Sequence, residues 1–403
     1  VESRGLGDVY KRQQVTFAER LVLENVLDAA EAGATILTYH EATGFETAGD
    51  RVTGVRVHDT LTGRQETLAV KAVVNAAGPW VDEVIGRADS PAPRLIGGTK
   101  GSHIVVRPFE GAADEALYVE AAADGRPIFI LPWNGLYLIG TTDIRYEGSL
   151  DDVRASRAEI DYLLEEANRL FPGARLTVDD VCYTYSGVRP LPSQEEGPTS
   201  AITRRHMIVP GSSVGRNLLS IVGGKLTTYR HLAEEAVDAV AELLDRKLPD
   251  CRTGERPLPG ARPDDSEPSL PRSLSAAGRE RLFTIYGSRA PGIAELAERE
   301  PGLDSAIDAD GRVCAAEIAF VIRSEGPRTL ADVVFRRTML GLDEDQGRPL
   351  YSAIAAIAAR EFGWDEAETV AQRKALDAYS DSLLPLAGDQ TSSTNSSLPR
   401  PGK

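Results

Sequence analysis

Three cationic or titratable side chains could together accept a proton from a hydroxyl group and bind an anion. They are His103, which follows Gly101-Ser102, Arg189, which precedes Pro190, and Lys225, which follows two glycines. The ordinary pKa of an imidazole lies near neutral pH, so His103 could accept a hydroxyl proton. A guanidinium can hold two oxygens of a phosphate or stabilise a developing alkoxide. For His103 alone, the alternative is a strand histidine satisfied by a neighbour, and for Arg189 it is a surface ion pair.

Lys225 belongs to a strand, glycine turn and helix pattern. The apolar run 218–222 precedes Gly223-Gly224, and apolar residues then recur at helical spacing over 229–244. The glycines permit a tight turn and close approach of a ligand, and a helix start offers free N–H groups to an anion. Lys225 could therefore bind a phosphate or another anionic ligand. An ordinary strand-to-helix connection is the alternative.

Several predicted strands end near these residues. The apolar segment 72–80 ends in small residues, which let a cofactor approach the backbone. Further strands are predicted over 100–106 and 183–190. Residues 127–133 and 136–143 form a predicted hairpin around Asn134-Gly135, a strong hairpin signal.

The remaining segments complete the expected elements. Apolar periodicity predicts helices over 17–32 and 151–170 and a mostly helical region over 274–380. Residues 35–38 are expected to form a short strand, and residues 51–58 and 66–70 two strands of a meander.

Composition limits the class of protein. The 403 residues carry a formal net charge of -16, which argues against general nucleic-acid binding. Three cysteines without close spacing make a disulfide framework or zinc site unexpected and favour a reducing compartment. No apolar run approaches the roughly 18 residues of a membrane span, and a cytoplasmic location is expected.

The motifs, taken in order, resemble those of one family. Residues 75–80 (Asn-Ala-Ala-Gly-Pro-Trp), 100–103 (Lys-Gly-Ser-His), 140–143 (Gly-Thr-Thr-Asp), 185–190 (Tyr-Ser-Gly-Val-Arg-Pro) and 223–230 (Gly-Gly-Lys-Leu-Thr-Thr-Tyr-Arg) are similar to the flavin-dependent glycerol-3-phosphate dehydrogenases. The likeness covers about residues 14–380. It implies an α/β fold: an incomplete FAD-binding Rossmann-like domain, an antiparallel-sheet substrate domain and an all-α C-terminal domain.

The resemblance also implies the boundaries of the parts. A partial FAD-binding domain is expected at 14–97 and 200–246, and a β-rich substrate domain at 98–199. A linker at 247–273 leads to a helical domain at 274–386. Residues 1–13 are expected to be a non-native segment and residues 387–403 a disordered tail.

Roles for single residues follow from the same resemblance. His103 is expected to be the base, with Arg189 and Lys225 also in the catalytic set. Substrate contacts are expected from Arg189, Lys225, Thr142 and Tyr229. Contacts with FAD are expected from Asn75, Ala77, Gly78, Ser186, Gly187, Gly223, Gly224, Lys225, Leu226 and Thr227.

The implied reaction is oxidation of sn-glycerol 3-phosphate to dihydroxyacetone phosphate. Electrons are expected to pass to quinone or another acceptor. We also expect peripheral contact with the inner membrane face, through an arginine cluster that includes Arg323. A homo-oligomer is a further expectation. The alternative within enzymes is an amine or amino-acid oxidase of the same FAD superfamily.

One departure from the family is large. The sequence contains no Gly-x-Gly-x-x-Gly turn after a strand, which in the family holds the FAD pyrophosphate, and no acidic ribose ligand after it. A truncated family member is therefore expected, with an unpaired sheet edge and an exposed apolar face. The 403-residue chain is expected to bind FAD weakly and to lack dehydrogenase activity, and a non-catalytic fragment is the alternative from another class.

Overall fold

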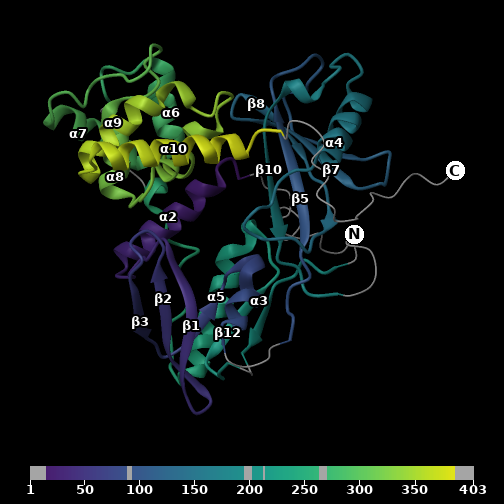
Figure 1. The fold of residues 1–403 in the computed structure, drawn as a ribbon, viewed down its shortest axis with the longest axis vertical. Helices are drawn as coiled ribbons and strands as arrows, with labels where there is room; N and C mark the ends of the chain where they lie inside the picture. The colour runs from purple at the N-terminus through teal and green to yellow at the C-terminus, as the bar shows by residue number, and fades with distance from the viewer. Residues whose placement is uncertain (1–14, 89–92, 195–201, 212–213, 263–269, 386–403) are drawn as a thin grey trace.

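The computed structural model describes residues 15–88, 93–194, 202–211, 214–262 and 270–385. Figure 1 shows a large sheet with a covering helix at the right, smaller sheets below, and a cluster of helices at the upper left. This mixed α/β arrangement with a helical C-terminal region confirms the predicted fold class. The predicted segments 1–13 and 387–403 lie outside the described residues.

The largest sheet has six strands and carries His103 and Arg189. Its order is β10-β5-β8-β7-β6, with β9 paired to β5. The Asn134-Gly135 turn joins β7 to β8 with positive φ at both residues, 52° and 74°, as a two-residue hairpin turn requires. The strands are β5 (Thr99–Val106), β6 (Leu117–Glu120), β7 (Pro127–Trp133), β8 (Leu136–Gly140), β9 (Ile144–Arg145) and β10 (Val181–Arg189).

Helix α4 (Arg157–Leu170) covers one face of this sheet. Ile104, Ile139 and Leu163 are fully buried in the core between them. The Ser156 hydroxyl accepts from Glu159 N, and the Ser156 N–H donates to the Glu159 carboxylate, so both N–H groups at the helix start are satisfied. Because side chains alternate along a strand, the other face of the sheet points away from α4.

A second sheet holds the glycine turn. Its order is β11-β12-β4, from β11 (Met207–Pro210), β12 (Leu218–Val222) and β4 (Val73–Asn75). Every residue of β12 is buried, as its continuous apolar sequence predicts. Strands β4 and β12 are parallel. Helix α3 (Val81–Gly86) follows β4, and α5 (Tyr229–Leu243) follows β12.

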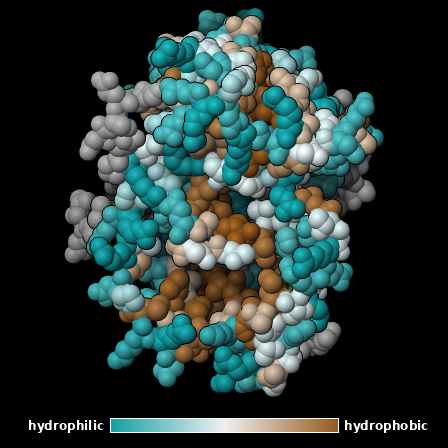
Figure 2. Space-filling model, turned by 90° about the vertical axis from the view of Figure 1, so that its left-hand side faces the viewer, coloured by the Kyte–Doolittle hydropathy of each residue, from teal (hydrophilic) through white to brown (hydrophobic). Residues whose placement is uncertain are grey.

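Strand β4 lies at the edge of this sheet among the described residues. Val74 on that strand is 41% exposed, and Val237 on α5 is 54% exposed. These values agree with the expected open edge and apolar face. Figure 2 shows apolar surface gathered in a hollow in the lower half of the molecule.

The meander forms a three-stranded sheet of its own, from β1 (His40–Ala48), β2 (Arg51–Asp59) and β3 (Gln65–Ala69). The two predicted strands are confirmed, and β1 is an addition. The strand expected at 35–38 is wrong, since these residues are irregular. They lie between Gly33 and Tyr39, both with positive φ, which interrupts extended backbone at each end.

The C-terminal helices share one apolar core. They are α6 (Ala276–Tyr286), α7 (Ala290–Arg299), α8 (Ala315–Ser324), α9 (Tyr351–Phe362) and α10 (Glu366–Ser382). The predicted first helix is α2 (Ala18–Glu31), and it docks here through buried Arg20, which pairs with Glu325 at 2.8 Å. The described part of the predicted linker also contacts α2, because Gly260 N donates to Glu24.

Candidate functional site

The face of the large sheet opposite α4 brings the predicted catalytic residues together. His103 pairs with Tyr185 of β10 on one side and with Gly140 of β8 on the other. Because residues two apart on a strand share a face, Gly101 and Arg189 project from the same face as His103. This face is the one that α4 does not cover.

His103 lies flat on this face. Its ring stacks on Tyr185, with centroids 4.8 Å apart and planes 16° from parallel. The ring also lies over Gly140, where any Cβ would overlap it. Burial and, secondarily, the charge of Arg189 lower the pKa of His103 from 6.5 to about 4. The imidazole is therefore neutral at physiological pH.

The guanidinium of Arg189 is held by three consecutive residues. Its Nη2 donates to Thr141 Oγ1 at 3.0 Å and to Thr142 O at 3.1 Å, and its Nη1 donates to Asp143 Oδ1 at 3.1 Å. The group crosses over Gly101, where a Cβ would overlap it. Glycines at 101 and 140 thus make room for the two functional side chains.

Arg204 is a site residue that the sequence motifs did not reveal. Its Nη2 lies 3.9 Å from Asp143 Oδ2, so Arg189 and Arg204 share one carboxylate. Arg126 also donates to the backbone carbonyl of Asp143, while pairing with Asp124. Burial lowers the pKa of Arg189, and the Arg204 and Arg126 charges act in the same direction while Asp143 opposes them. The surplus positive charge suits an anion.

Two predicted contacts do not fit this geometry. The Thr142 hydroxyl donates to Glu159 Oε1 at 2.7 Å, and the Ser186 hydroxyl contacts Ser102 Oγ at 2.7 Å. Both groups lie on the α4 side of the sheet, away from His103. Their residue types gave no sign of this, because the face depends on strand register. The hydroxyl groups are therefore directed away from the proposed site, and a contact of Thr142 with substrate or of Ser186 with cofactor would have to come from the backbone.

The glycine turn after β12 lies next to the end of β10. Gly223 N donates to Pro190 O at 2.8 Å, so the turn is anchored one residue beyond Arg189. Gly223 has φ 77°, and a Cβ there would meet Arg205 O at 2.7 Å. Gly224 has φ 98°. These two positions require glycine.

Helix α5 begins at Tyr229, where the helical spacing of apolar residues begins, and not directly after the two glycines. Lys225 has extended backbone, residues 226–228 form a 3-10 turn, and α5 starts at Tyr229. Lys225, Thr227 and Tyr229 are half-buried, and Leu226 is 42% exposed. The N–H groups nearest to the glycines therefore belong to the turn rather than to α5.

The segment after β4 lies beside this turn, because β4 and β12 are parallel neighbours. The Asn75 side chain is buried and donates to Val81 O while accepting from Ala77 N. It shapes the turn, so only its backbone remains for a ligand. Gly78 has φ 58° and open space where a Cβ would be. Ligands of parallel sheets bind at such carboxyl ends.

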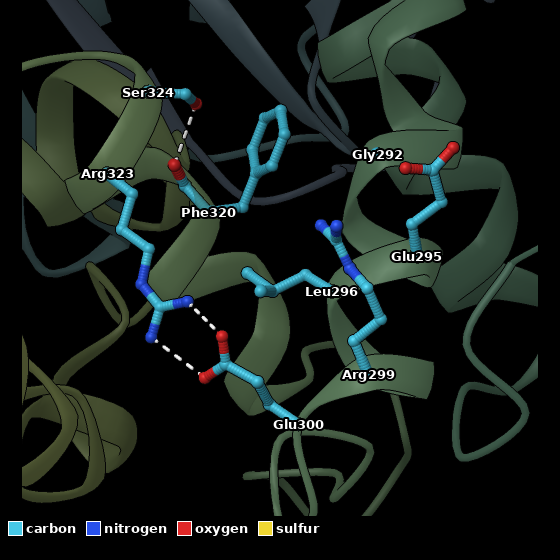
Figure 3. Close-up of a pocket in the computed structure, with 8 residues that line it drawn as sticks. All are labelled: Gly292, Glu295, Leu296, Arg299, Glu300, Phe320, Arg323 and Ser324. Atoms are coloured by element: carbon cyan, nitrogen blue, oxygen red, sulfur yellow. Dashed lines mark hydrogen bonds and ion pairs between the residues drawn. The ribbon is translucent and has the colours of Figure 1, made fainter.

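A second hollow, of about 620 Å³, lies on α7 and α8 and contains none of the predicted site residues. Figure 3 shows Arg323 there bonded to Glu300 through both terminal nitrogens, at 2.5 and 2.9 Å. Its Nε also donates to Glu361. Because two glutamates neutralise Arg323, this residue offers less positive charge for binding an anionic membrane surface than the sequence suggested. None of the helices in the described part of the chain has the length and apolar character needed to cross a bilayer.

Comparison with known families agrees with this geometry. Residues 5–230 match the family described as FAD dependent oxidoreductase. Residues 251–369 match the family described as the C-terminal domain of alpha-glycerophosphate oxidase. The sheets that hold the site and the helical region thus match two separate families.

Individual relatives point the same way. A glycerol-3-phosphate dehydrogenase of Synechocystis sp. is 44% identical over 384 residues, which are 91% of this chain and 69% of that protein. A D-erythritol 1-phosphate dehydrogenase of Brucella abortus is 37% identical over 335 residues, 79% of this chain and 64% of that protein. This chain therefore spans about two thirds of these relatives.

A solved structure shares the fold. The glycerol-3-phosphate dehydrogenase from Bacillus halodurans, complexed with FAD, superposes with a TM-score of 0.75 at 30% identity, covering 92% of this chain and 74% of that one. The family matches and the Synechocystis relative together establish the assignment. This chain belongs to the glycerol-3-phosphate dehydrogenase family of FAD-dependent oxidoreductases.

Proposed function

We propose that this chain supplies the substrate site and part of the FAD site for the oxidation of sn-glycerol 3-phosphate to dihydroxyacetone phosphate. The observation that carries this proposal is the neutral His103 beside the Arg189 guanidinium on the sheet face opposite α4. The glycine turn bonded to Pro190 adjoins the same face. A proton acceptor, an anion site and a glycine-lined cofactor edge are the three parts that the reaction needs.

The residues present fit part of FAD. The turns that follow β4 and β12 adjoin each other, and Gly78 and Gly187 both have open space where a Cβ would be. Gly78, Gly187 and residues 223–227 would hold the ring and ribityl chain, where bound flavin supplies hydride acceptance. Ala77 would contribute through van der Waals contact, because its N–H donates to Asn75 and its carbonyl accepts from Trp80 N.

His103 is proposed to accept the substrate hydroxyl proton. Its Nδ1 is buried without a hydrogen-bond partner among the described residues. Protonation of the free ring would add a buried N–H without an acceptor, which helps to keep the ring neutral. A bound phosphate would offset the charge of Arg189 and raise the pKa of His103 toward the working pH.

Arg189 and Arg204 are proposed to bind the substrate phosphate. Two guanidinium groups that share Asp143 leave one positive charge uncompensated. This favours a phosphate dianion over the single carboxylate of an amino-acid substrate. Lys225, with Tyr229 at the start of α5, would add to the anion site from the glycine turn. Longer polyol phosphates, such as the one named for the Brucella relative, are the natural competitors in an assay.

Electron transfer to quinone or another acceptor, peripheral membrane contact and a homo-oligomer are further proposals. They rest on the family resemblance. An acceptor screen in the presence of saturating FAD, with and without vesicles, tests the first two.

The substrate proposal is tested by calorimetric titration of the chain with sn-glycerol 3-phosphate and with glycerol. We expect binding of the phosphate ester only, and a loss of affinity of roughly tenfold or more in Arg189→Gln, since charged hydrogen bonds are lost. Arg216→Gln is the matched control, because Arg216 pairs with Asp50 at the surface with 62% of its side chain exposed. Equal affinity for glycerol, or an unaffected Arg189→Gln variant, would contradict the proposal.

A further inference from the structure

A buried carboxylate lies directly behind the anion site, on the α4 side of the sheet. Glu159 is 1% exposed and belongs to the first turn of α4. Its Oε1 accepts from Ser102 Oγ at 2.8 Å and from Thr142 Oγ1 at 2.7 Å. Its Oε2 pairs with Lys100 Nζ at 2.7 Å. The carboxylate therefore ties the helix start to β5 and to the segment that follows β8.

Glu159 remains charged in this position. Burial alone would raise its pKa, but the hydrogen bond and charge of Lys100, with bonds from Ser156 and Thr142, hold the pKa below its ordinary value. A charged acceptor makes the hydrogen bond from Thr142 stronger than a bond between neutral groups. The contact is shielded from solvent, because Thr142 itself is only 2% exposed.

Thr142 connects this carboxylate to the guanidinium on the opposite face. Its hydroxyl donates to Glu159 and also accepts from Ser102 N at 2.9 Å. Its carbonyl accepts from Arg189 Nη2 at 3.1 Å, and its two neighbours supply the other acceptors of Arg189. The same residue thus has its side chain fixed on one face and its backbone in use on the other.

We propose that Glu159 is a positioning residue for the substrate anion, acting through Thr142 on Arg189. This inference rests on the proposed function, because it assumes that Arg189 binds the phosphate. Glu159 touches neither substrate nor cofactor. It fixes the 141–143 segment, and this segment holds the guanidinium flat over Gly101 before the ligand arrives. Such preorganisation lowers the ordering cost of binding.

The test compares variants that each remove a hydrogen-bond partner of one oxygen of the Glu159 carboxylate. Thr142→Val removes the hydroxyl that links Glu159 to the arginine segment. Ser156→Ala removes the hydroxyl contact to Oε2 and the side-chain helix cap, but it keeps the backbone bond to Oε2 and the Thr142 link. Both variants lose stability, so urea unfolding is measured first and binding is then measured under conditions where both are folded. Thr142→Ser retains the hydroxyl and serves as the conservative rescue.

The ligands are sn-glycerol 3-phosphate and inorganic phosphate, titrated by calorimetry. We expect Thr142→Val to bind both roughly 5- to 10-fold more weakly, with Ser156→Ala and Thr142→Ser within twofold of the wild type. If Thr142→Val does not fold, Thr142→Ala deletes the same hydroxyl and should show the same loss. If the hydroxyl-deleted variant binds the ligands as tightly as the wild type, or if Ser156→Ala loses as much affinity, the positioning role of Glu159 is overturned. The proposed function would then still stand. Absence of binding by the wild type would overturn the proposed function and this inference with it.

Discussion

The low pKa of His103 makes the stability of the fold depend on pH in a defined window. The folded-state pKa is about 4, against 6.5 for an ordinary imidazole. Between these values the unfolded chain binds a proton that the folded protein does not, so stability is fully present above pH 6.5 and falls as the pH approaches 4. Each pKa unit is worth about 1.4 kcal/mol, so the total is about 3 kcal/mol, of which about 2 kcal/mol is lost by pH 5.

Replacement of His103 by glutamine removes this contribution and leaves the other titrating groups in place. We expect the free energy of unfolding of the wild type to drop about 2 kcal/mol more than that of His103→Gln between pH 7 and pH 5. Urea unfolding at several pH values measures the difference. NMR titration of the histidine Cε1 protons gives the pKa directly, and Arg189→Gln should raise it to a value still below 6.5, since burial is the larger cause. Parallel pH profiles for the wild type and His103→Gln would refute the reasoning.

Three further outcomes are expected. Gly101→Ala should weaken sn-glycerol 3-phosphate binding roughly tenfold, because its Cβ would displace the Arg189 guanidinium. Gly86→Ala is the control and should not change the affinity, since position 86 has open space for a Cβ. Calorimetric titration compares the two variants. Glu159→Gln should cost about 3–5 kcal/mol in urea unfolding because it leaves a buried lysine unpaired, whereas Asp161→Asn, from an exposed pair, should cost under about 1 kcal/mol. Residues 1–403 should bind FAD more weakly than micromolar in a flavin-fluorescence titration, and submicromolar binding with turnover would show another pyrophosphate site.

Local patterns predicted most strands and helices around the site. The apolar run of β12, the Asn134-Gly135 turn and the periodicity of α4 each depend on neighbours in sequence, so they could be recognised directly. The irregular 35–38 segment could not, because a short apolar run forms a strand only if a partner strand lies beside it.

The composition of the site was harder to predict than its position. His103 and Arg189 share one face because of the register between β5 and β10. The same register turns Ser186 toward α4, and the segment after β8 directs the Thr142 hydroxyl to Glu159 of that helix; no residue type signals either choice. Arg204 enters through a contact with Asp143 across 61 residues of sequence, beyond the reach of any local pattern.

The two glycines under the functional side chains affect how the site could evolve. Gly101 and Gly140 leave shallow channels in the sheet surface, and the Arg189 guanidinium and the His103 ring lie within them. Because stacking on Tyr185 restrains His103 and hydrogen bonds to residues 141–143 restrain Arg189, little rotamer freedom remains to be lost when a substrate binds. Specificity for longer polyol phosphates could then change at other positions around the face, while substitution of either glycine would disturb proton transfer or anion binding itself.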